Sequence, residues 1–207
     1  MLKDGRPKRN IQKSASFRIL AAGGKLKLRS PDPKHFYMAG LFDTVFEHHR
    51  AIGALLMFGL SSSALALLRT LIETGYRLIW MDTCASDQAV KRITGFSRRG
   101  FPDIARIISD LVRSSRISEF KTRLPNLEIL NDFTHSGATH IIRRFQRVGK
   151  KEACFEQDAF FCVHCSDYLL FLVGTLFYTA YGEPEYAQTI MQEYFKLLTT
   201  YEPPSPI

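Results

Sequence analysis

The sequence lacks the short motifs that identify the commonest enzyme classes. It contains no glycine-rich phosphate loop, no G-x-S-x-G nucleophile turn and no H-E-x-x-H zinc pair. It also has no internal repeat and no strand-like alternation of apolar and polar residues. These absences give no support to a P-loop NTPase, an α/β-hydrolase or a zinc protease, and they leave helices as the expected secondary structure.

Cysteine is scarce, and its spacing indicates neither a disulfide framework nor a metal site. The four cysteines follow no framework pattern and no secretory signal precedes them, so free thiols in a reducing bacterial cytoplasm are expected. The segment Cys162-x-His164-Cys165 matches half of a zinc motif, but no second ligand pair lies at a useful spacing. We therefore expect no metal and no cofactor.

Acidic residues are nearly absent from the first 34 positions, where ten Lys or Arg face only Asp4 and Asp32. A Gly-Gly pair, a Ser-Pro-Asp-Pro turn signal and weak apolar periodicity predict that residues 1–34 form a basic, disordered arm. Three explanations of this arm stay open. It is a solvated tail without a function, it results from a start codon upstream of the true start near Met38, or it binds phosphate groups. Because residues 35–207 carry eighteen basic and eighteen acidic side chains, the folded body is neutral overall.

Apolar residues recur at helical spacing through the rest of the chain and predict seven helices. The uncharged run of 18 residues at 51–68 is long enough to raise the question of a membrane span, but Gly59 and the three serines at 61–63 predict a tight turn inside it, so no membrane insertion is expected. The expected helices cover residues 35–58, 62–84, 86–95, 102–115, 125–148 with a break near Gly137, 153–181 and 185–201, of which 62–84 and 153–181 are the most buried.

These patterns together predict an all-α protein: one antiparallel helical bundle over residues 35–202, with short peripheral helices and a proline-rich tail at 203–207. The bundle is expected to form a homodimer, because its long apolar helices exceed what one small bundle covers. The final helix is expected to contribute to the dimer through one amphipathic stripe: Tyr186, Ile190, Tyr194, Leu197, Leu198 and Tyr201.

One stripe of charge runs along the helix at 62–84. Arg69, Glu73 and Arg77 follow one another at i, i+4 spacing, with Trp80 and two threonines on the same side. The stripe is either an ordinary solvent face with exposed ion pairs or a shared polar pocket in which the arginines present donors to an anion.

A second polar group lies in the segment that begins at Pro125. Asp132 and His135 are three residues apart and share a helix face, where the carboxylate can fix the imidazole tautomer, and Asn131 is adjacent. Ordinary capping and surface roles for these residues are the alternative. The basic residues that follow, Arg143, Arg144 and Arg147, are candidates for binding phosphate, as is the basic face that begins at Arg106.

The segments ALLRTLIETGYRLIW and LNDFTHSGATHIIRRF resemble those of small bacterial helical proteins with an Arg-x-x-x-Glu core helix and a later polar segment with histidine. Such proteins are similar in layout to the HEPN superfamily, helical bundles of toxin-antitoxin and phage-defence systems, many of which cut RNA without a metal. The resemblance implies His135 as the catalytic histidine, with Asn131 and Asp132 as its polar neighbours. The R-x(4-6)-H motif of those nucleases is missing, because Glu128, Ile129 and Leu130 hold the positions before His135.

Two functions follow from these features. The first expectation is a non-catalytic HEPN-like module of a defence or toxin-antitoxin system that binds RNA, a nucleotide or a partner protein, with Arg77, Asn131 and the later arginines as binding residues. The alternative is a metal-independent endoribonuclease in which His135 is the acid or base and Arg69, Glu73 and Asp132 complete the site. A purely structural, oligomerising protein is the third possibility.

Overall fold

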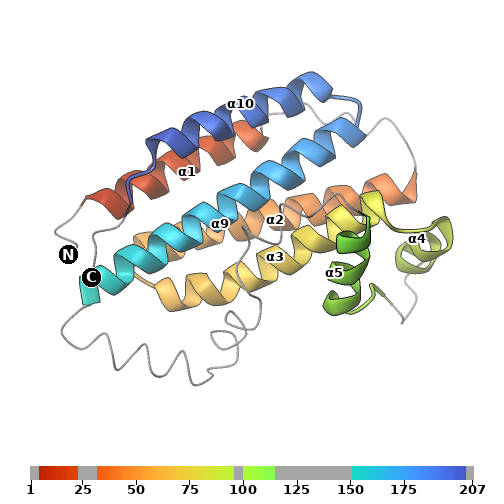
Figure 1. The fold of residues 1–207 in the computed structure, drawn as a ribbon, viewed down its shortest axis with the longest axis horizontal. Coiled ribbons are helices and arrows are strands. Elements are labelled where there is room, and N and C mark those ends of the chain that lie inside the picture. The colour runs from red at the N-terminus through yellow and green to blue at the C-terminus, as the bar shows by residue number, and fades with distance from the viewer. Residues whose placement is uncertain (1–4, 23–31, 96–99, 115–150, 204–207) are drawn as a thin grey trace.

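The computed structural model describes residues 5–22, 32–95, 100–114 and 151–203, and these residues form an all-α bundle without a β-strand (Figure 1). The predicted fold class is therefore confirmed. The helices are α1 (Arg6–Ala22), α2 (Pro33–Met57), α3 (Ser61–Thr83), α4 (Asp87–Thr94), α5 (Ile104–Arg113), α9 (Lys151–Ala180) and α10 (Pro184–Thr200).

Helices α2 and α3 form an antiparallel hairpin. Asp32 caps α2 by accepting a hydrogen bond from the Lys34 amide, and Gly59 has a φ of 75°, a left-handed conformation that favours glycine. The amide of Leu60 then donates to the carbonyl of Leu55 at 2.9 Å, which closes the turn. The uncharged run at 51–68 is thus divided between two helices, as the sequence predicts.

Helices α3 and α9 supply the centre of the core. Leu68, Leu71 and Ile72 on α3 and Leu169 and Val173 on α9 are completely buried. Residues 155–180 of α9 are long and apolar enough to cross a membrane by length and composition, but 61% of the apolar window is buried inside the bundle. The prediction that these two helices lie at the centre of the core agrees with this packing.

Helix α1 corrects the prediction that residues 1–34 are a disordered arm. Residues 6–22 form a helix that packs on α2, α9 and α10 (Figure 1). Ile11, Phe17 and Ala21 are buried in the core, together with the polar side chains of Asn10 and Ser14. Because the buried stripe is partly polar, its helical period carries little hydrophobic signal, and the bundle begins before residue 35.

The amphipathic stripe of α10 is used within the monomer. Ile190, Tyr194 and Leu197 are at most 7% exposed and face the bundle core, while the turn before the helix uses Gly182 at a φ of 76°. These three residues are therefore not available to a dimer interface, and homodimerisation stays a prediction. Residues on the other side of α10, among them Met191 and Phe195, remain exposed.

Candidate anion-binding site

The predicted charge stripe on α3 contains two ion pairs that share one carboxylate. Arg69 Nε donates to Glu73 Oε1 at 2.8 Å, and an Arg77 Nη atom donates to Glu73 Oε2 at 3.3 Å. The side chains of Arg69, Glu73 and Arg77 are 19%, 18% and 29% exposed, so the stripe is neither an open solvent face nor a buried site. Both arginines are engaged by Glu73, so the single carboxylate is shared between two positive charges.

The partly buried geometry of this stripe predicts a moderate stability effect. Arg69→Ala is expected to lower the free energy of unfolding by about 1–2 kcal/mol, between the values for exposed and buried ion pairs. Chemical denaturation followed by circular dichroism measures the change, with Arg92→Ala as a control because Arg92 is exposed on the peripheral helix α4. A loss equal to that of the control would show that the stripe contributes nothing to stability.

The other predicted site residues, Asn131, Asp132, His135, Arg143, Arg144 and Arg147, lie outside the described residues. The convergence of His135 with Arg69, on which the ribonuclease function depends, therefore stays a prediction.

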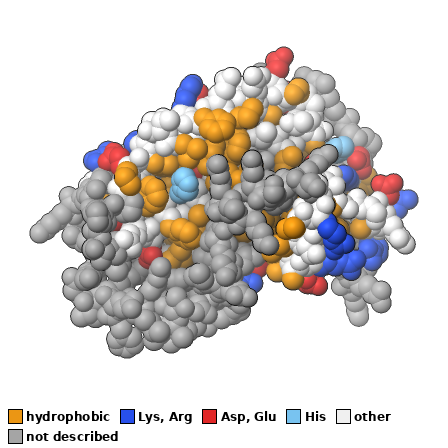
Figure 2. Space-filling view, viewed as in Figure 1, with side chains coloured by type: hydrophobic (Ala, Val, Ile, Leu, Met, Phe, Trp, Pro, Cys, Tyr) orange, Lys and Arg blue, Asp and Glu red, His pale blue; other side chains and the backbone are white. Residues whose placement is uncertain are grey.

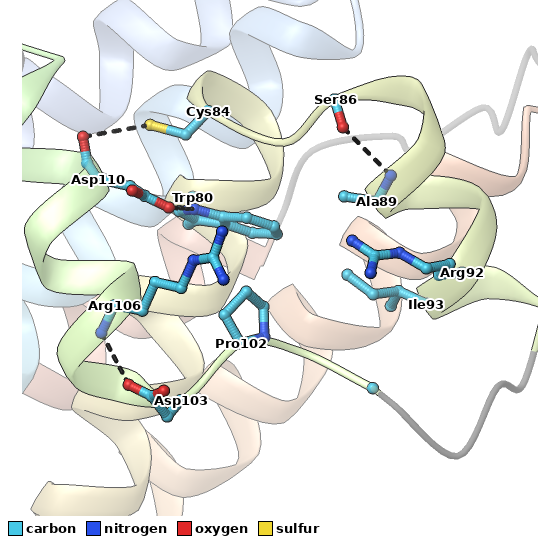
Figure 3. A pocket seen from close by; sticks show the side chains of 11 residues that line it. Trp80, Cys84, Ser86, Ala89, Arg92, Ile93, Pro102, Asp103, Arg106 and Asp110 are labelled. Carbon is cyan, nitrogen blue, oxygen red and sulfur yellow. Dashed lines mark hydrogen bonds between the residues drawn. The ribbon is translucent and has the colours of Figure 1, made fainter.

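A cavity of about 380 Å³ lies at the end of the bundle, where α4 and α5 meet the last turn of α3 (Figure 3). Its volume falls within the range of pockets that hold small molecules. The cavity is lined by Trp80, Cys84, Ser86, Ala89, Arg92, Ile93, Gly100, Pro102, Asp103, Arg106 and Asp110.

Local capping holds the two short helices on either side of this pocket. Ser86 Oγ accepts from the amide of Ala89 and begins α4, while Asp103 Oδ1 accepts from the amide of Arg106 at 2.8 Å and begins α5. Trp80 Nε1 donates to Asp110 Oδ2 at 3.0 Å and ties α5 to α3. These bonds fix the backbone positions from which the charged side chains enter the pocket.

The carboxylates of the pocket are engaged, whereas its two guanidinium groups are not. Asp103 is held by a backbone amide, and Asp110 accepts from Trp80 and lies 3.5 Å from an Arg113 Nη atom. In the described part of the chain, Arg92 and Arg106 make no side-chain hydrogen bond or ion pair. Figure 3 shows both guanidinium groups directed to the space between α4 and α5. Two unneutralised arginines around one cavity are the arrangement that binds an oxyanion such as phosphate or carboxylate.

The groups that line this pocket favour binding over catalysis. No histidine is among them, and the two carboxylates already accept hydrogen bonds. Cys84 is half-buried, and its thiol contacts the carbonyl oxygen of Asp110 at 3.8 Å without a neighbouring base. The pocket thus offers two anion donors and a Trp80 wall but no activated nucleophile.

The sequence interpretation missed a buried polar cluster, which we call the Asp167 cluster: Ser14, His49, Asp167 and Tyr201. His49 Nε2 lies 2.5 Å from Asp167 Oδ1, Ser14 Oγ donates to the same oxygen at 2.8 Å, and the Tyr201 hydroxyl donates to Oδ2. His49 and Asp167 are 2% and 0% exposed. Apolar periodicity gave no signal for this cluster, because its members are polar and come from four separate segments.

The Asp167 cluster contains the residue types of a catalytic triad but not the geometry. In a triad the base uses one imidazole nitrogen for serine and the other for aspartate. Here Ser14 and Asp167 both lie at Nε2 of His49, at 3.5 and 2.5 Å, and Nδ1 has no partner among the described residues. The serine hydroxyl donates to the aspartate and is buried, so the cluster is structural.

The cysteine pair on α9 is also buried. Cys162 and Cys165 are inside the core, and burial raises the pKa of the Cys165 thiol to about 12, so this thiol is protonated at neutral pH. Among the residues that the structure describes, no three His, Cys, Asp or Glu side chains are placed to hold a metal ion.

Comparison with known proteins gives a family but no activity. No curated protein and no solved structure matches the chain. A family model described as a family of unknown function, DUF6988, matches residues 42–199, from the middle of α2 to the end of α10. Because this match covers more than half of the sequence, the chain belongs to the DUF6988 family.

Proposed function

We propose that the protein is a non-catalytic helical module that binds a nucleotide through its phosphate groups, in the pocket between α3, α4 and α5. The observation that carries this proposal is the pair of guanidinium groups, Arg92 and Arg106, which enter one cavity without a carboxylate partner in the described part of the chain.

The shape of the site favours a mononucleotide over a long RNA. A cavity of about 380 Å³ encloses one small ligand, and Trp80, Ile93 and Pro102 provide an apolar wall for a base. Two arginines can share the charge of a phosphate chain through bidentate hydrogen bonds. An RNA strand would instead need a groove that continues along the surface.

The binding function is also favoured over ribonuclease activity by the charge stripe. Arg69 and Arg77 are both held by Glu73, so they are poorly placed to receive the charge of a phosphorane. The proposed role is in a bacterial defence or toxin-antitoxin system, and the proposed location is the cytoplasm. The resemblance and the composition of the sequence support these two parts of the proposal.

The single tryptophan of the chain makes this proposal directly measurable, since Trp80 lines the pocket. Titration with AMP, ADP, ATP or pyrophosphate is expected to change the Trp80 fluorescence, with calorimetry as a second readout. Arg92→Ala and Arg106→Ala should each weaken binding about tenfold or more, because a hydrogen bond to a charged group contributes about 1.5–3 kcal/mol. The double variant should lose binding.

Lys91→Ala is the matched control, since Lys91 lies on the same helix as Arg92 but is exposed and outside the pocket lining. It removes the same charge and should bind nucleotide nearly as well as the unchanged protein. If none of the four probes binds, or if the control weakens binding as much as the pocket variants do, the proposed function is wrong.

A further inference from the structure

We propose that the outward side of α9, together with the adjacent residues of α10, binds a second copy of this chain and forms a homodimer. We call this surface the α9–α10 face and define it by Phe161, Phe171, Leu172, Met191 and Phe195. It lies on helices other than those that line the nucleotide pocket, so this inference is independent of the proposed function.

The α9–α10 face is apolar and open to solvent. Phe161, Met191 and Phe195 are 37%, 37% and 53% exposed, and Figure 2 shows hydrophobic side chains gathered in a band over these helices. Phe171 and Leu172 are partly buried and pack against the core. Contiguous apolar surface of this kind marks an interaction site in a soluble protein.

The same face carries no charge along α9. Between residues 159 and 182 the only Asp, Glu, Lys or Arg side chain is Asp167, which is 0% exposed, and the one histidine is His164. In a two-fold dimer each group meets the same surface of its partner, so a charged face would bring like charges together. A neutral face avoids that cost and is therefore suited to self-association.

The aromatic residues of this face are already ordered in the monomer. Phe171 stacks on Tyr194 with ring centroids 4.4 Å apart and an interplanar angle of 6°, and Phe195 packs against Phe171 at 6.1 Å. Tyr194 itself is 1% exposed and anchors the group to the core. Side chains that are fixed before association lose less entropy when a partner binds.

The charge around the face argues against a lipid or nucleic-acid partner. Residues 152–207 contain eight acidic residues and a single basic residue, Lys196. Anionic membrane surfaces and nucleic acids attract Lys and Arg clusters and are repelled by acidic surfaces. A neutral apolar strip in acidic surroundings therefore fits a protein partner, and a second copy is a partner with the same strip.

Light scattering of the full chain at micromolar concentrations tests this inference. The protein should have twice its chain mass of 23.6 kDa, and Phe195→Glu should reduce the mass to that of one chain by placing a carboxylate in the interface. Phe161→Glu tests the same face from α9. Phe58→Glu is the matched control. Phe58 is 82% exposed at the α2–α3 turn, so this substitution makes the same chemical change outside the α9–α10 face.

Circular dichroism and thermal melts of all three variants establish that each is folded, and Met191→Glu replaces any α9–α10 variant that is not. The inference is supported if the unchanged protein is a dimer and only the substitutions in the α9–α10 face make it a monomer. A monomeric unchanged protein overturns it, as does a dimer that survives the face substitutions or that is lost equally in the control. Binding of a monomer to vesicles of phosphatidylcholine and phosphatidylglycerol would overturn it in favour of a membrane partner.

Discussion

Asp167→Ala is expected to lower the free energy of unfolding by about 3–5 kcal/mol, the loss that follows when one partner of a buried ionic group is removed. The Asp167 carboxylate is the acceptor shared by α1, α2 and the residue after α10, through Ser14, His49 and Tyr201. Without it, the buried Ser14 and His49 and the half-buried Tyr201 hydroxyl lose their acceptor, and each buried unsatisfied group costs free energy.

Urea denaturation followed by circular dichroism measures this loss, provided that the dependence on urea concentration is unchanged. Asp43→Ala is the matched control, because Asp43 is an exposed carboxylate on α2. It should change the stability by less than about 0.5 kcal/mol, as surface substitutions usually do. Asp167→Asn should fall between the two, since the amide retains one acceptor oxygen. Equal stability of Asp167→Ala and Asp43→Ala would contradict the role assigned to the Asp167 cluster.

Gly75→Ala is expected to destabilise the protein by about 1–3 kcal/mol, the cost of inserting a methyl group into a packed core. At Gly75, α3 comes so close to α9 that an added Cβ would lie 2.7–2.9 Å from three side-chain carbons of Leu169. Leu169 is completely buried, so its side chain has little room to move. The two helices must separate or Leu169 must leave its rotamer.

The same substitution at Gly40 should have the opposite sign. Gly40 lies in α2, is exposed, and has nothing within 4 Å of an added Cβ. Alanine is favoured over glycine in a helix by about 1 kcal/mol, so Gly40→Ala should stabilise the protein. Thermal or urea denaturation of the two variants compares the change in stability that each added methyl group causes. A stabilised Gly75→Ala variant would show that α3 and α9 do not pack as closely as described.

The long helices could be predicted because their patterns are local. The wide apolar arcs at 62–84 and 153–181 predict α3 and α9 to within a few residues, and Gly59 predicts the turn before α3. The helices expected at 86–95 and 102–115 also match α4 and α5, whose starts differ from the prediction by one and two residues. Each of these signals lies within one element, so no knowledge of tertiary contacts is needed.

The remaining features depend on contacts between distant segments. His49 and Asp167 are separated by 118 positions, and nothing in either neighbourhood indicates the other. Helix α1 escaped prediction because Asn10 and Ser14 occupy its buried stripe, where tertiary hydrogen bonds replace apolar packing. The pocket itself was not predicted. The sequence places Trp80 beside the α3 stripe and Arg106 on a basic helix face, but the approach of Arg92 on another helix depends on the fold.

The docking of α1 has a consequence for the order in which the protein is synthesised. Asn10 forms hydrogen bonds with the main chain of Glu202, across 192 positions, and Arg9 forms an ion pair with the side chain of Glu202. At about 5–20 residues per second, α1 leaves the ribosome roughly 10–40 seconds before this partner is made. During that interval α1 presents Asn10, Ser14 and several basic side chains to water, with few large apolar groups. The polar residues that kept α1 from being predicted thus also limit aggregation of the nascent chain until the partner segment of this helix has been synthesised.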